Sequence, residues 1–221
     1  MGIQDRKKRE KEGRRHQILT AAKQLFADHG FQQTTMEEIA KEAELSPGTI
    51  YLYFKSKDEL FAELSLNIVR YLISRLENLC IEEKISVEQK LSAVKDILQD
   101  VCTFDSFILV NALKLQSGDT LKKLSPGLFN ELQKQVCKVA VHLSDIFSEG
   151  IRNGTFIDKR PDIFTGVLWA VFSGAILLNE IQESFTSRPH DLPQVLENAF
   201  EIFARGIKTT PRVEKAPPSI S

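Results

Sequence analysis

Residues 34–60 read TTMEEIAKEAELSPGTIYLYFKSKDEL, and this stretch predicts short helices separated by tight turns. Thr35 stands three residues before Glu38, which is the spacing of a capping box, and an apolar stripe at helical spacing follows. Ser46 and Pro47 then supply an N-cap residue and a proline suited to the first helical position. The pattern predicts a helix of about two turns, a turn, and a second short helix.

The second short helix divides its side chains between two faces. Ile50 and Phe54 stand at i and i+4 and are expected to face a small core. Gly48 is a poor helix former, costing roughly 1 kcal/mol relative to alanine, and close approach of the backbone to a bulky partner would explain it. The side chains left to point elsewhere are Thr49, Tyr51 and Tyr53.

Another helix is expected to start just after these two short helices, because Ser56 and Glu59 form another capping-box pattern. Lys55 and Lys57 lie at this junction, where a lysine and a helix N-terminus can hold a phosphate. Tyrosines on short helices are more often packing residues, and lysines beside a cap are usually only solvated. It is the combination that favours a helix-turn-helix DNA-binding domain.

The same residues resemble a known family. SPGTIYLYFKSKDELF, preceded by FADHGFQQTTMEEIAKEAEL, is similar to the N-terminal domain of TetR-type transcriptional regulators over residues 14–61. The resemblance implies that Thr35, at the start of the first of the two short helices, contacts a phosphate. It implies that the edge of the recognition helix in the major groove is formed by Ser46, Pro47, Gly48, Thr49 and Tyr51. Residues implied to hold the DNA backbone are Tyr53, Lys55 and Lys57.

Composition limits the other possibilities. The chain has 221 residues, 42% hydrophobic and 27% charged, with a formal net charge of −1. This is ordinary for a soluble globular protein of one large or two small domains. The chain is not uniformly basic, so affinity for DNA must come from a local patch.

The cysteines and the N-terminus indicate a reducing compartment. Cys80, Cys102 and Cys137 are odd in number and lie far apart without a CxxC spacing, which argues against a disulfide framework or a structural zinc site. The first residues are charged where a signal peptide needs an apolar run. We therefore expect a cytoplasmic protein without a metal.

The helical pattern predicts an all-α chain in four parts. Residues 1–13 are expected to form a flexible basic arm. Residues 14–60 form the three-helix DNA-binding domain, whose first helix ends at Gly30. Residues 61–208 form a larger helical domain for effector binding and dimerisation, and residues 209–221 a disordered tail.

Residues 166–178, GVLWAVFSGAILL, are the most apolar stretch of the chain. At this length the stretch is too short to span a bilayer, so we expect protein to bury it and no membrane partner. With the helix predicted over 191–207, it supplies more apolar surface than one domain needs, which favours a homodimer built as a four-helix bundle rather than internal core alone. The predicted interface residues are Gly166, Ala170, Gly174, Leu178, Val195, Ala199, Ile202 and Phe203.

The resemblance also implies an effector pocket walled by the middle helices, and a predominance of Phe and Leu favours a small hydrophobic effector. Each candidate lining residue is individually more typical of ordinary core. The candidates are Asn67, Phe104, Phe107, Asn111, Cys137, His142, Trp169 and Phe172.

Together these patterns predict a ligand-responsive repressor that binds a palindromic double-stranded DNA operator as a homodimer and is released by its effector. The alternative is an all-α small-molecule binding protein that acts through protein partners. No glycine-rich phosphate loop, GxSxG, HExxH or paired-carboxylate motif appears, so we expect neither an enzyme nor a cofactor.

Overall fold

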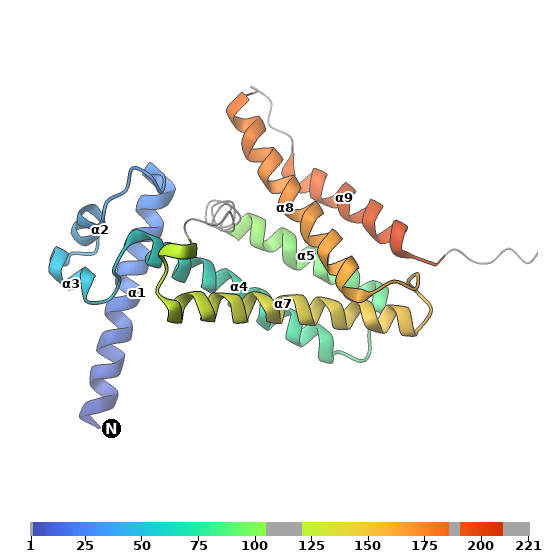
Figure 1. Cartoon of the computed structure of the whole chain (residues 1–221), viewed down its shortest axis with the longest axis horizontal. Coiled ribbons are helices and arrows are strands. Elements are labelled where there is room, and N and C mark those ends of the chain that lie inside the picture. Colours follow the sequence, from blue (N-terminus) through green and yellow to red (C-terminus); the bar gives the residue numbers. More distant parts are fainter. Residues whose placement is uncertain (1, 105–120, 186–190, 210–221) are drawn as a thin grey trace, which may run out of the picture. The chain divides into compact units, whose positions relative to one another are not determined.

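The computed structural model describes residues 2–104, 121–185 and 191–209, and the regular elements in these ranges are helices (Figure 1). The predicted all-α class is therefore confirmed. The apolar residues after Phe104, including Phe107 and Asn111, and the tail from residue 210 lie outside the described residues. The helices are α1 (Ile3–His29), α2 (Met36–Glu42), α3 (Pro47–Tyr51), α4 (Lys57–Ile81), α5 (Val87–Phe104), the 3-10 turn η1 (Leu121–Lys123), α7 (Pro126–Arg152), α8 (Pro161–Phe185) and α9 (Leu192–Ile207).

Backbone contacts divide the chain into two compact units. The first contains Met1–Leu76 and Ile97–Val139, and the second contains Glu77–Asp96 and Ala140–Ser221. The boundary predicted after residue 60 falls inside the apolar core of the helix-turn-helix, because Phe61 and Leu64 of α4 belong to it. The first turns of α4 are thus part of the DNA-binding fold.

The core of the helix-turn-helix is formed by α1, α2, α3 and the start of α4. Phe26 and Phe61 are buried in it and the half-buried Phe31 packs against both, with ring centroids 5.2–5.9 Å apart. Phe31 lies after α1 and packs back against this core. Aromatic side chains bury large apolar areas, which suits a domain with such short helices. The other buried members are Ile18, Leu19, Ala21, Ala22, Met36, Ile39, Ala40, Ala43, Ile50, Phe54, Leu60 and Leu64.

The first helix begins earlier than predicted. Residues 3–13, expected to form an arm, belong to α1, which runs without a break to His29, and residues 4–13 are exposed. The wrong start at Arg14 has a physical reason: no apolar stripe marks these turns, and an exposed helix rich in charge lacks the period that signals a helix. The predicted end at Gly30 is correct, and its N–H donates to the Phe26 carbonyl.

The second unit is organised around Phe147 of α7. Its ring lies 5.5 Å from Phe164 of α8, 6.0 Å from Phe203 of α9 and 6.3 Å from Phe156 in the loop between α7 and α8. Helices α8 and α9 pack side by side (Figure 1). An ion pair also joins α5 to α9, since the Lys95 ammonium donates to the Glu197 carboxylate at 2.8 Å.

The turn after α7 depends on Gly150. Its carbonyl accepts hydrogen bonds from the N–H groups of Thr155 and Phe156, and Gly154, with φ of 73°, reverses the chain between them. A Cβ on Gly150 would lie 2.1 Å from the Phe156 ring, which is itself 1% exposed. The close packing of Phe156 therefore requires glycine at position 150.

Helix α8 is longer than its most apolar stretch suggests. The helix has 25 residues, and its window Pro161–Asn179 has a mean hydropathy of 1.6. By length and composition alone this helix could cross a membrane, so the expectation drawn from residues 166–178 is wrong in that respect. One third of this window is buried within the protein. The buried side chains Phe164, Leu168, Phe172 and Ile176 repeat at helical spacing, which is the pattern of a helix packed on one side.

We predict that Gly150→Ala destabilises the protein by about 1–3 kcal/mol, because the new methyl group must displace a fully buried aromatic ring. Gly127→Ala is the matched control: Gly127 lies in the same helix, and a Cβ there meets nothing within 4 Å. Urea unfolding at one protein concentration measures both variants. Equal midpoints would contradict the packing of Phe156 against Gly150.

Candidate nucleic-acid interface

Helix α2 starts with the capping box predicted from the sequence. The Thr35 hydroxyl accepts a hydrogen bond from the Glu38 N–H at 3.2 Å, and the Glu38 carboxylate accepts one from the Thr35 N–H at 2.8 Å. The bond from the Thr35 backbone is the largest cause of a lowered pKa for Glu38, so the carboxylate stays ionised. Thr35 is exposed at this N-terminus, where the helix dipole favours an anion.

The turn between α2 and α3 rests on an unusual glutamate. Glu44 adopts a left-handed conformation with φ of 51°, and its N–H donates to the Lys41 carbonyl. The Leu45 N–H donates to the Ala40 carbonyl at 2.9 Å, which completes a Schellman motif. Leu45 then packs on the core. Glycine is the usual residue at such a position, so the sequence carried no signal for this turn type.

Helix α3 is a five-residue helix capped by Ser46. The Ser46 hydroxyl accepts from the Thr49 N–H at 3.2 Å and lies 2.8 Å from the Thr49 hydroxyl, while Pro47 occupies the first turn. Ile50 at 0% exposure and Phe54 at 2% fasten the helix to the core. The predicted cap and the inward face are both confirmed.

The outer edge of α3 is open to solvent. Ser46, Pro47 and Gly48 are exposed, and a Cβ on Gly48 would approach only the Ser46 hydroxyl, at 4.0 Å. Nothing in the described chain therefore requires glycine at this position. Tyr51 is 47% exposed, and Leu52, which the sequence analysis did not single out, is 82% exposed. This edge, from Ser46 to Leu52, is called the reading edge below.

The residues expected to hold the DNA backbone have different environments. Tyr53 packs against the core and is half-buried, whereas Lys55 is exposed. The Lys57 ammonium donates to the carbonyls of Phe31, Gln32 and Thr34 at 2.7–3.0 Å. An ammonium has three N–H donors, so Lys57 anchors the loop before α2 and has no donor left for a phosphate.

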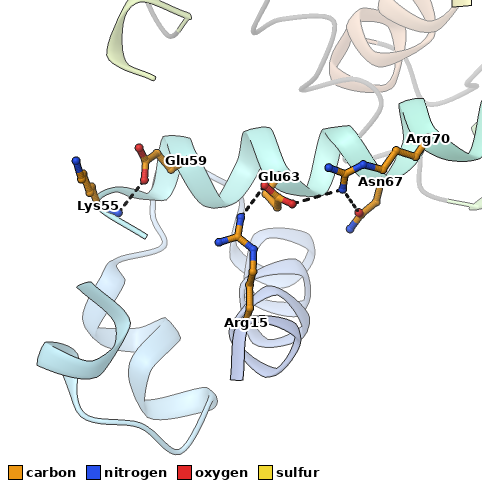
Figure 2. Close-up of polar contacts among 6 residues, drawn as sticks. All are labelled: Arg15, Lys55, Glu59, Glu63, Asn67 and Arg70. Atoms are coloured by element: carbon orange, nitrogen blue, oxygen red, sulfur yellow. Dashed lines mark hydrogen bonds and ion pairs between the residues drawn. The ribbon is translucent and has the colours of Figure 1, made fainter. Parts of the chain in front are cut away.

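An ion-pair network joins α1 to α4 within the first unit. Figure 2 shows the Arg15 guanidinium of α1 bound to the Glu63 carboxylate of α4 at 2.7 Å, and Glu63 in turn 3.5 Å from Arg70. The Arg15 guanidinium also lies 4.4 Å from the centroid of the Phe54 ring, just beyond α3. Arg15 therefore contacts both α4 and the residue that fastens α3.

The start of α4 is held by a variant of the predicted capping box. The Glu59 N–H donates to the Ser56 hydroxyl, but the Glu59 carboxylate accepts from the Lys55 N–H, one residue before the expected partner (Figure 2). This bond orders the backbone of Lys55 while its side chain remains in solvent.

The candidate effector residues are spread over both units. Asn67 is exposed and accepts from Arg70 at 3.4 Å, and Cys137 is exposed on α7. His142 is half-buried, with its Nε2 atom 3.6 Å from Glu77. Trp169 and Phe172 lie together on α8 with ring centroids 6.0 Å apart. Phe104 is the last residue of α5, while Phe107 and Asn111 lie outside the described residues.

The two other cysteines have neutral thiols. Burial raises the pKa of the Cys102 thiol to about 12. Burial, followed by the charge of Asp145, raises the pKa of the Cys80 thiol, which donates to the His142 carbonyl. Thiolates are the reactive form, so these two cysteines are poor nucleophiles.

Half of the predicted interface residues of α8 and α9 are exposed. Gly166, Ala170 and Leu178 are exposed on α8, and Ile202 on α9 is 73% exposed. Gly174, Val195 and Ala199 are half-buried. The prediction is wrong for Phe203, which is 7% exposed and packs on Phe147 inside the same protomer. Phe203 follows the exposed Ile202 by one residue, which turns its side chain about 100° around the helix toward the core. Sequence analysis missed Ile163 and Val167, 48% and 45% exposed, although both continue the stripe of Ala170 and Gly174.

Comparison with known proteins agrees with this geometry. Residues 18–64 match the model of the bacterial regulatory proteins of the tetR family. The chain is 30% identical over 197 residues to the fatty acid metabolism regulator protein of Bacillus subtilis (strain 168), which covers 86% of this chain and 94% of the relative.

Two solved structures share the fold. The fatty acid degradation regulator FadR from Bacillus halodurans has a TM-score of 0.69 and 21% identity, covering 87% of this chain and 95% of that one. FadR from Bacillus subtilis in complex with stearoyl-CoA has a TM-score of 0.67 and 22% identity, covering 87% and 98%. At these identities the likeness supports the fold alone.

A capped five-residue helix with a free outer edge, packed on two neighbouring helices, defines a helix-turn-helix DNA-binding protein. The chain belongs to the TetR family of bacterial regulatory proteins. It is a ligand-responsive DNA-binding transcriptional regulator, which confirms the resemblance and disfavours the alternative of a binding protein that acts through protein partners. The relatives are transcriptional regulators, which are not enzymes.

We predict that Lys57→Met lowers the free energy of unfolding by about 1–3 kcal/mol, because three carbonyls lose a charged donor. Lys55→Met, two residues away and exposed, is the matched control and should change stability by less than about 0.5 kcal/mol. Thermal and urea unfolding measure both. If the two variants were equally stable, Lys57 would be free for another role.

Proposed function

We propose that this regulator is a repressor that binds a palindromic operator as a homodimer and leaves it when a long-chain acyl effector binds. The observation that carries the proposal is the reading edge. Its backbone is fixed by the burial of Ile50 and Phe54, while Gly48 and Tyr51 remain uncovered. A rigid helix with a free edge is what insertion into a major groove requires.

Phosphate contacts are proposed to flank the reading edge. Thr35 and Lys55 are exposed on either side of α3 along the chain. Lys7, Lys11 and Arg14 stand at i, i+4 and i+7 of α1, on the face that continues as the buried residue Ile18. The side of α1 that packs on the domain thus becomes basic beyond it. Such contacts position a protein on DNA without reading its sequence.

Dimerisation is proposed to use the free faces of α8 and α9. Ile163, Val167 and Leu178 expose about half or more of their surface on α8, and Ile202 does so on α9. Small residues between them, such as Ala170, allow close helix approach. A second copy of the chain covers such faces in a four-helix bundle and places two reading edges about one helical turn, roughly 34–36 Å, apart on DNA.

The effector is proposed to be a long-chain acyl-CoA. The relative at 30% identity over most of the chain is a fatty acid metabolism regulator, and a structural neighbour holds stearoyl-CoA. Apolar side chains such as Trp169 and Phe172 suit an acyl chain. The remaining candidate lining residues, Asn67, Phe104, Phe107, Asn111, Cys137 and His142, remain predictions for mutagenesis.

Release is proposed to follow a shift in population. An effector that prefers a conformation in which the two reading edges no longer match the operator removes the protein from DNA. Helix α4 runs from Lys57 to Ile81, and Arg15 binds its residue Glu63 (Figure 2). A displacement of α4 therefore carries α1 and α3 with it. The proposal needs no catalysis, no cofactor and no membrane, and it places the protein in the cytoplasm.

We expect sequence-specific binding to DNA whose affinity falls steeply as the salt concentration or the stearoyl-CoA concentration rises. The wild-type protein should select a palindrome from a random duplex library, with log affinity falling by about 0.9 per phosphate contact for each unit of log salt. Stearoyl-CoA should lower operator occupancy, measured by fluorescence anisotropy, while free coenzyme A should not.

Tyr51→Ala should weaken operator binding at least roughly tenfold, in line with about 1–3 kcal/mol for a specific base contact. Tyr71→Ala is the control, because Tyr71 is 41% exposed on α4, away from the reading edge. Selection of no common sequence would overturn the DNA-binding role of this edge, and insensitivity to stearoyl-CoA would overturn the effector class alone.

Ile202→Glu should convert the dimer into monomers, because the carboxylate would be buried without a partner. Val141→Glu is the matched control, since Val141 is 56% exposed on α7, outside the proposed interface. Light scattering after size exclusion distinguishes the two masses. A dimeric Ile202→Glu variant, or a monomeric wild type, would contradict the interface.

A further inference from the structure

Leu52 is the most exposed of the large hydrophobic side chains in the described chain. Its exposed fraction is 82%, compared with 47% for its neighbour Tyr51. The position follows from packing: Ile50 and Phe54 face the core, and Leu52 stands two residues from each, on the opposite side of the helical turn. The backbone of Leu52 is fixed, since its N–H donates to the Thr49 carbonyl at 3.2 Å and its φ and ψ are helical.

A single exposed leucine on a surface needs no explanation, but this one lies on the reading edge. The other exposed residues of the edge are Ser46, Pro47, Gly48 and Tyr51, and a Cβ on Gly48 would approach only the Ser46 hydroxyl. In the major groove, base edges present hydrogen-bonding groups and one apolar group, the 5-methyl of thymine. An isobutyl side chain has no hydrogen-bonding atom, so it can only favour the methyl group.

We propose that Leu52 reads thymine: its side chain packs against the 5-methyl group of one thymine in each half-site of the operator. The inference rests on the proposed insertion of the reading edge into the major groove and adds the base it selects. Burial of the methyl group against Leu52 removes apolar surface of both partners from water. A cytosine at the same position would present an amino donor to the leucine and leave that donor unsatisfied.

Deoxyuridine tests the contact, because it differs from thymidine only by the absent methyl group. An operator is first obtained by selection of the wild-type protein on a random duplex library. Each thymine is then replaced by deoxyuridine, in both half-sites together, and affinity is measured by fluorescence anisotropy. At one symmetric pair of positions the wild-type protein should lose roughly 15-fold in affinity, about fourfold for each methyl group.

Leu52→Ala should bind the thymine and deoxyuridine operators equally at that pair of positions. Its fold should be unchanged, because the side chain is exposed and packs on nothing, and unfolding midpoints verify this. Ile81→Ala is the control: Ile81 is 76% exposed at the end of α4, and this variant should keep the full preference for thymine.

The outcomes separate this inference from the proposed function. Sequence-specific binding that no deoxyuridine substitution weakens, or an equal loss for the wild type and Leu52→Ala, would overturn the role of Leu52 and leave the DNA-binding edge standing. Failure to select any sequence would instead overturn the proposed reading edge. A thymine dependence lost in Leu52→Ala and kept in Ile81→Ala supports the assignment.

Discussion

The rest of the DNA-binding surface depends on the burial of Ile50 and Phe54. A helix of five residues does not persist in water, because nucleation costs more than so few hydrogen bonds return. Burying each of the two side chains contributes about 1.5–3 kcal/mol and holds α3 in place. Since both face inward, Tyr51 and Leu52 have no other direction than outward. The same contacts that stabilise the helix therefore aim it.

Charged groups join this small core to its neighbours. Arg15 stacks on Phe54 and binds Glu63, while the Lys57 ammonium donates hydrogen bonds to three carbonyls of the loop before α2. Both cations hold segments of the fold together, although Lys57 was expected to contact the DNA backbone. The consequence for a regulator is that α1, α3 and the start of α4 are tied to one another, so a movement of α4 is expected to turn the reading edge as one body.

The second unit has a different design. Its aromatic side chains converge on Phe147, and the turn after α7 closes only because Gly150 leaves room for Phe156. With the interior filled by Phe203, the apolar residues left outside are those of the opposite faces, such as Val167 and Ile202. Two helices with a packed face and a free apolar face are suited to a partner of the same kind, which is the basis of the proposed dimer.

The amino-acid sequence by itself determined where the short helices α2 and α3 begin, because caps such as Thr35 with Glu38 and Ser46 with Thr49 are contacts between residues three apart. It also determined the family, through the motif around α3. Only the tertiary structure decided which side chains are free. Lys57 meets carbonyls 23–26 residues away, and Phe203 meets Phe147. Burial and the partner of a charge depend on segments distant in the chain, and periodicity along one helix carries no information about them.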